Sequence, residues 1–164
     1  MSEMFHLTPT WVFGVFFILL YFGYVQSKAR EVAKASLLIV PVAMIGLSLF
    51  SVWSAFGLSV TGYAFWAIGV VLALLLNRAL QQPRGVRYLS DSGRFSIPGS
   101  YVPLALMMAI FFTKYFITAT IATQFLSPKI PAFVAIGSFI LGLFSGTFAA
   151  RARKMWQTGG AASI

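Results

Sequence analysis

Residues 101–124 read YVPLALMMAIFFTKYFITATIATQ, a stretch in which Lys114 is the only charged residue. An apolar run of this length crosses the hydrocarbon core of a bilayer as a helix. Four further apolar runs occupy residues 11–25, 37–58, 63–76 and 132–150. None alternates apolar and polar residues, as the strands of an outer-membrane barrel would. The sequence therefore predicts an all-α, polytopic membrane helix bundle with five transmembrane helices.

The flanking residues give the expected boundaries of these helices. Thr8-Pro9 before the first run is a helix start signal, and residues 1–7 lack the Lys or Arg of a signal peptide. We predict one transmembrane domain over residues 1–157, followed by a flexible tail over residues 158–164. Residues 81–99 are predicted to form an irregular loop. The expected spans are about 9–26, 36–58, 62–80, 100–125 and 131–150.

The composition excludes several classes of protein. Hydrophobic residues make up 59% of the chain and charged residues 9%, against roughly 25% charged in soluble domains. The chain has no cysteine and one histidine, His6, so we expect no metal site and no cofactor. The net charge of +9 is attributed to membrane topology and anionic lipid, and no nucleic-acid partner is predicted.

The distribution of cations predicts the orientation. Ten of the 12 Lys and Arg residues lie in residues 28–34, 78–94 and 151–154, whereas the alternate connecting segments hold only Lys129. The positive-inside rule places the N-terminus outside and the C-terminus inside a bacterial cytoplasmic membrane. Three loop arginines are predicted to contact lipid head groups: Arg84, Arg87 and Arg94.

Two pairs of spans resemble each other. Placing Pro41 over Pro103 aligns a Pro-x-Ala pattern and a later Phe-Ser/Thr-x-aromatic pattern, and Ala-Phe-x-Ala-Ile-Gly begins at both Ala64 and Ala132. Spans two and three thus resemble spans four and five, so we predict a duplicated hairpin preceded by one extra helix. Helix kinks are expected at Pro41 and Pro103.

Small residues predict a close helix contact in the last span. Gly142-x-x-x-Gly146 is a small-x-x-x-small face, where two helix backbones can approach each other. Its partner is left open between another span of the same chain and a second protomer.

Lys114 is the candidate functional residue. It lies near the middle of its span, ten residues or about 15 Å from Gln124, and a charge at that depth costs about 2.5–3.5 kcal/mol. Tyr115 and Thr118 add polarity on the same helix, and Tyr21 and Ser54 lie at a depth where they could converge on it. Four interpretations stay open: a neutral amine, hydrogen bonds to hydroxyls or backbone, a bound anion, and a carboxylate of a partner protein.

Two stretches carry a resemblance to a known family. Thr8-Pro9-Thr10-Trp11-Val12-Phe13, and Pro98-Gly99-Ser100-x-x-Pro103-Leu104 continuing to Phe111-x-x-Lys114-Tyr115, resemble a family of small bacterial membrane proteins of unknown function. The resemblance covers nearly the whole chain and implies a bacterial inner membrane and several spans. It implies no activity.

These observations leave two main hypotheses for the function. The first is a homo-oligomeric transporter or binding protein for a small anionic or amphipathic molecule, with Lys114 at a buried polar site. The alternative is an accessory or structural subunit of a larger membrane complex, in which Lys114 meets a partner's carboxylate. A lipid-modifying enzyme ranks third, because the spans contain no nucleophile with a His or carboxylate base.

Overall fold

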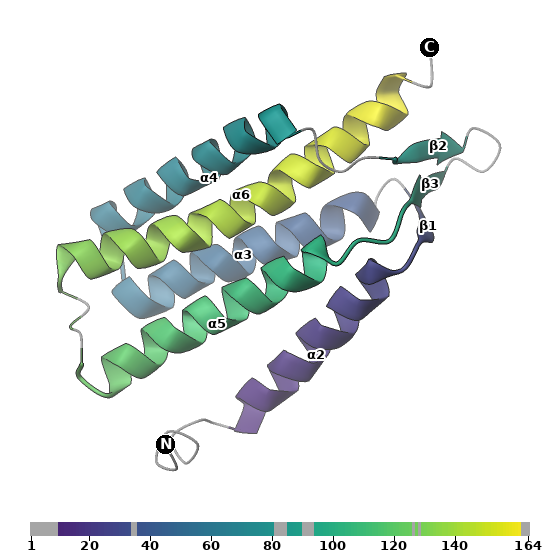
Figure 1. The fold of residues 1–164 in the computed structure, drawn as a ribbon. Helices are drawn as coiled ribbons and strands as arrows, with labels where there is room; N and C mark the ends of the chain where they lie inside the picture. Colours follow the sequence, from purple (N-terminus) through teal and green to yellow (C-terminus); the bar gives the residue numbers. More distant parts are fainter. Residues whose placement is uncertain are drawn as a thin grey trace.

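The computed structural model describes residues 10–33, 36–80, 85–89, 94–125, 127 and 129–161. Within this part the chain forms five helices and a small sheet (Figure 1). The helices are α2 (Thr10–Ser27), α3 (Ser36–Phe56), α4 (Val60–Leu80), α5 (Val102–Ala122) and α6 (Pro131–Ala161). The strands are β1 (Arg30–Ala33), β2 (Arg87–Leu89) and β3 (Arg94–Ile97).

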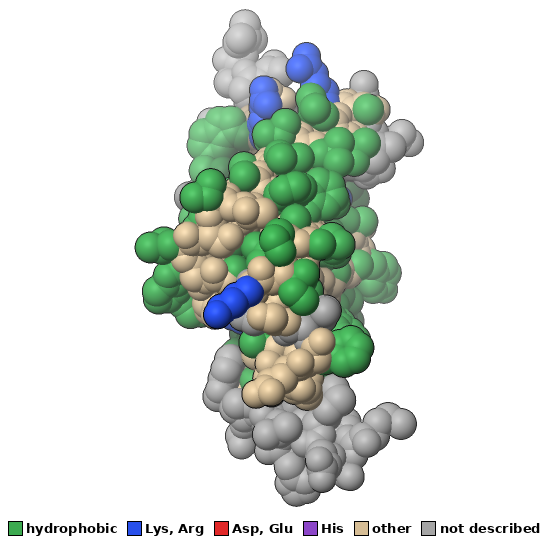
Figure 2. Space-filling view, turned by 90° about the vertical axis from the view of Figure 1, so that its left-hand side faces the viewer, with side chains coloured by type: hydrophobic (Ala, Val, Ile, Leu, Met, Phe, Trp, Pro, Cys, Tyr) green, Lys and Arg blue, Asp and Glu red, His purple; other side chains and the backbone are tan. Residues whose placement is uncertain are grey.

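The five predicted helices are all present. Four of them, α3 to α6, are long and apolar enough to cross a membrane, and α2 contributes a shorter apolar stretch, Val12–Ser27. Helix α6 runs to Ala161, past the predicted end at residue 150 and into the segment predicted as a flexible tail. Large hydrophobic side chains cover much of the described surface in Figure 2. The protein is therefore a helical bundle compatible with a membrane.

Helix α6 is the central packing element. It lies against both α3 and α4, while α2 lies along α5 at the other side of the bundle (Figure 1). A Cβ atom at Gly142 would collide with the Trp66 carbonyl oxygen, and one at Gly146 would lie 2.7 Å from the Val70 carbonyl oxygen. The partner of the small-residue face, which the sequence left open, is therefore α4 of the same chain.

A buried serine links three helices in the bundle core. The Ser48 hydroxyl on α3 donates to the Leu141 carbonyl oxygen on α6 at 3.1 Å, and it accepts a hydrogen bond from Trp66 Nε1 on α4 at 2.9 Å. Two further buried hydroxyls on α6, Ser138 and Ser145, make no hydrogen bond. The three serines thus offer a matched comparison of satisfied and unsatisfied hydroxyls in one core.

We expect Ser48→Ala to lower the free energy of unfolding by about 1–3 kcal/mol, since it leaves the Trp66 N–H without its acceptor. Ser138→Ala and Ser145→Ala should be neutral or stabilising, because they remove hydroxyls that have no partner. Reversible unfolding in mixed detergent micelles measures all three variants. Equal destabilisation by the three substitutions would show that the change in unfolding free energy comes from lost volume and not from lost hydrogen bonds.

The irregular loop predicted over residues 81–99 contains two strands, β2 and β3, so the prediction was wrong at residues 87–89 and 94–97. Strand β3 pairs with β1 and β2, both antiparallel, in the order β1-β3-β2. Strands of three or four residues are too short to give a periodic pattern, and the β1 partner lies more than 60 residues earlier in the chain. The fold is an all-α bundle with one small sheet at one end, which we call the sheet end (Figure 1).

The two faces of this sheet differ in character. Val32 pairs with Phe95, which is fully buried, and Arg30 lies on the same face of β1 two residues earlier. Glu31 lies on the opposite face, paired with Ser96, and is exposed. The inner face therefore lies against the bundle and brings the side chain of Arg30 with it.

The two prolines aligned in the sequence lie in different helical positions. Pro41 is inside α3, as expected. Pro103 is in the first turn of α5, which begins at Val102, rather than a turn or two inside the helix. A proline there has no intrahelical hydrogen bond to remove, so the reason for a kink at Pro103 does not apply.

Candidate functional site

A groove runs between α2, α3 and α5 and contains the predicted site lysine. Its volume is about 340 Å³, which lies in the range of small-molecule sites. Its walls are mainly apolar: Leu19 comes from α2, Met44 from α3, and Met107 from α5. We call this space the lysine groove.

Lys114 is half-buried in the wall of this groove. Its Nζ atom lies 4.8 Å from the centre of the Phe50 ring on α3, a cation–π geometry. The one acidic residue in the described part of the chain, Glu31, is in β1 at the sheet end. The amine of Lys114 thus faces aromatic and apolar groups without a carboxylate from any described residue.

The structure brings together three of the five predicted site residues. Tyr115 and Thr118 line the groove with Lys114. Tyr21 does not line it and is 66% exposed. Ser54 does not line it either, and its hydroxyl donates to the Ser51 carbonyl oxygen on its own helix at 3.2 Å. Tyr21 and Ser54 were predicted from their depth along their helices. In the structure, both side chains lie on helix faces that are outside the groove lining.

Two polar residues of the groove, Ser51 and Thr123, were not predicted as site residues, although helical spacing indicates Ser51. Ser51 is buried, and its hydroxyl donates to the Leu47 carbonyl oxygen at 2.7 Å. Met44, Leu47 and Ser51 all line the groove, at the i, i+3, i+7 spacing of one helix face. Thr123 lines the far end of the groove beyond α5.

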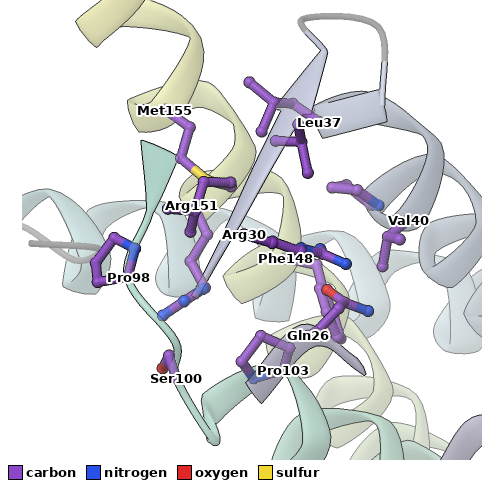
Figure 3. Close-up of a pocket in the computed structure, with 13 residues that line it drawn as sticks. Gln26, Arg30, Leu37, Val40, Pro98, Ser100, Pro103, Phe148, Arg151 and Met155 are labelled. Atoms are coloured by element: carbon purple, nitrogen blue, oxygen red, sulfur yellow. The ribbon is translucent and has the colours of Figure 1, made fainter. Parts of the chain in front are cut away.

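A second cavity, which was not predicted from the sequence, lies at the sheet end. It measures about 50 Å³ and is lined by Arg30 of β1, Arg151 of α6 and Gln26 of α2, among apolar residues of α3 and α5. Figure 3 shows the Arg151 side chain directed toward Ser100 and the Arg30 side chain directed toward Gln26. We call this cavity the arginine pocket.

Two donors of the arginine pocket are buried: the Arg151 guanidinium and the Gln26 side-chain nitrogen. Arg151 is only 6% exposed, and Gln26 Nε2 is buried without a hydrogen-bond partner. Burial lowers the pKa of Arg30, because the charged guanidinium loses hydration. Arginine nevertheless stays charged at neutral pH, so the pocket collects two positive charges.

The arginines predicted to contact lipid lie elsewhere. Arg87 and Arg94 are exposed, and the strand register places both on the face of the sheet opposite Phe95. Arg84 lies outside the described residues. In the sequence, Arg30 and Arg151 indicate only membrane orientation. In the structure, Arg151 follows the buried Phe148 by three residues on one helix face.

No metal site emerges from the described residues, which contain no group of three or more His, Asp or Glu side chains placed to hold an ion. No curated protein and no solved structure matches the chain at a significant level. The sequence model of a family of unknown function (DUF6622) matches residues 2–161. This match covers nearly the entire chain and agrees with the resemblance noted in the sequence, so the protein belongs to the DUF6622 family of unknown function.

Proposed function

We propose that the protein binds a small amphipathic molecule with an acidic group in the lysine groove. The observation that carries this proposal is the lysine amine in the wall of an apolar groove of about 340 Å³. The apolar walls suit a hydrocarbon chain, and Lys114 supplies a charged hydrogen-bond donor to the acidic group. Binding of such a ligand offsets the cost of a cation at this depth.

The proposed setting is a bacterial cytoplasmic membrane crossed by all five helices. Cations gather at the sheet end on β1, β2, β3 and the last turns of α6, whereas the opposite end has Lys129. The positive-inside rule supports a cytoplasmic sheet end and an external start of α2. Helix α2 has 18 residues, about 27 Å at helical rise, which approaches the thickness of the hydrocarbon core.

The proposed role is binding rather than catalysis. The groove offers the amine of Lys114 and the hydroxyls of Ser51, Tyr115, Thr118 and Thr123, but no His or carboxylate is among its lining residues. A hydroxyl nucleophile would need such a base to activate it. Transport would require the ligand to leave on the other side, and a second protomer would supply the additional walls that this step needs.

Photolabelling of the purified full chain tests the proposal. The probe is a 16-carbon carboxylate carrying a diazirine on its alkyl chain, and peptide mass spectrometry maps the labelled residues. We expect labels in α2 and α5 along the groove, with competition by palmitate and about tenfold weaker competition by hexadecanol, which lacks the charge.

Lys114→Met should reduce labelling by the carboxylate probe about tenfold, because it removes the ammonium and keeps an apolar side chain of similar length. Lys129→Met is the matched control, since Lys129 is exposed in the connection between α5 and α6. Labelling that is spread over the lipid-facing surface, or equal in both variants, would contradict the groove as a binding site.

The accessory-subunit hypothesis has a different signature. Native mass spectrometry of protein released in native-lipid nanodiscs would show a companion protein on the wild type that Lys114→Met loses. In that case a carboxylate of the companion, rather than of a small ligand, would occupy the groove. A homomeric particle with a small bound mass favours the ligand instead.

A further inference from the structure

The arginine pocket contains two positive charges and no acidic side chain from the described residues. Arg151 is 6% exposed, and neither it nor Arg30 makes an ion pair with a described residue. Glu31, the nearest acidic residue along the chain, is on the outer face of β1 and points away from the pocket. A buried cation without a counter-charge is unfavourable, and an anion in the pocket would offset that cost.

One neutral group of the pocket is a donor without an acceptor. Gln26 Nε2 is buried and lacks an acceptor, although it is in the wall of the cavity. Figure 3 shows the Gln26 amide beside the Arg30 side chain, so both present N–H groups to one region. An acceptor-rich ligand would satisfy these donors together.

Two helices begin at the pocket and add to its positive potential. Leu37 lies in the first turn of α3 and Pro103 in the first turn of α5, and both line the cavity. The first turn of a helix carries the positive end of the helix dipole. This field acts in the same direction as the two guanidinium charges.

The size of the cavity narrows the class of anion. Its volume of about 50 Å³ accommodates about four water-sized groups. A tetrahedral oxyanion has four oxygens, and arginine binds phosphate oxygens through two parallel N–H···O bonds. We propose that the arginine pocket binds a phosphate-type oxyanion, held by Arg30, Arg151 and Gln26.

The phosphate group has two potential sources, and the geometry suits both. The lysine groove begins one helical turn beyond the pocket, since Met44 follows Pro41 and Met107 follows Pro103. A lipid could therefore place its phosphate in the pocket and an acyl chain in the groove. A free phosphate ion would occupy the pocket alone. The site itself does not depend on Lys114, which is about 16 Å further along α5.

Calorimetric titration of the purified full chain in lipid-free maltoside micelles tests the proposal. The probes are inorganic phosphate, dioctanoyl phosphatidic acid, and dioctanoylglycerol, which has the same chains without the phosphate. Binding of inorganic phosphate assigns the site to a free oxyanion, and binding of phosphatidic acid alone assigns it to a lipid. Either result supports the pocket, provided that dioctanoylglycerol binds at least tenfold more weakly than phosphatidic acid.

Three variants decide whether the binding takes place in the pocket. Arg151→Gln, Arg30→Gln and Gln26→Leu should each weaken the probe that binds the wild type, by at least tenfold for the two arginines and by about threefold for Gln26. Gln26→Leu changes no charge, so it keeps the test decisive if an arginine variant fails to fold. Arg153→Gln on α6 is the matched control, because its side chain is exposed. Failure of both phosphate probes to bind, or equal binding by all variants, would overturn the proposal.

Discussion

Gly142→Val should abolish accumulation of folded protein. A Cβ atom at this position collides with the Trp66 carbonyl oxygen, and a valine adds two methyl groups to that collision. Backbone atoms of α4 cannot rotate away as a side chain can, so the two helices must separate along their whole contact. We expect a loss of about 3 kcal/mol or more in the free energy of unfolding, at or above the upper end of ordinary overpacking.

The matched control for this prediction is another helical glycine. Gly46 lies in the interior of α3, and a Cβ atom there meets nothing within 4 Å. Gly46→Ala should be neutral or stabilising by about 0.5–1 kcal/mol, because alanine has less backbone freedom to lose. Size-exclusion chromatography and unfolding in mixed micelles compare the two. Normal folding of Gly142→Val would disprove the tight contact between α4 and α6.

Phe95→Ala should detach the sheet from the bundle while leaving the helices intact. Phe95 is fully buried on the inner face of the central strand, opposite Val32 of β1. Removing a buried phenylalanine side chain costs about 3–5 kcal/mol, more than three short strands can supply on their own. Because Arg30 is on the same face of the sheet, phosphate binding in the arginine pocket should be lost as well.

Hydrogen exchange measured by mass spectrometry gives the direct readout. Residues 30–33 and 94–97 should lose protection in Phe95→Ala, while α4 and α6 keep theirs. Phe116→Ala is the control, since Phe116 is 66% exposed on α5. Retained protection of the strands would mean that backbone pairing, rather than the buried ring, holds the sheet in place.

The helices of this fold could be predicted from the sequence because each is a long apolar run. Their boundaries agree within a few residues, except at α6, whose polar last turns gave no apolar signal. The face formed by Gly142 and Gly146 was also predictable, but its partner was not, since α3, α4 and α5 are all apolar. The duplicated hairpin and the homo-oligomer stay predictions from sequence.

The site was predictable in part, for a different physical reason. Thr118 follows Lys114 by one helical turn, so their shared face required no knowledge of the other helices. Predicting where Tyr21 and Ser54 point requires the rotation of α2 and α3 about their axes. Apolar runs in the sequence do not determine these rotations. Arg30 and Arg151 were counted as topological charges, because a sequence gives the charge of a side chain and not its burial.

The order of strands in the sheet has a consequence for biosynthesis. Strand β3 is the last of the three to be made, yet both β1 and β2 pair with it. During translation, β1, α3 and α4 are therefore synthesised before the central strand β3. If one of these two helices failed to cross the bilayer, β1 and β3 would emerge on opposite sides and could not meet. In the proposed membrane setting, the sheet can therefore form only when α3 and α4 both cross the bilayer or neither does.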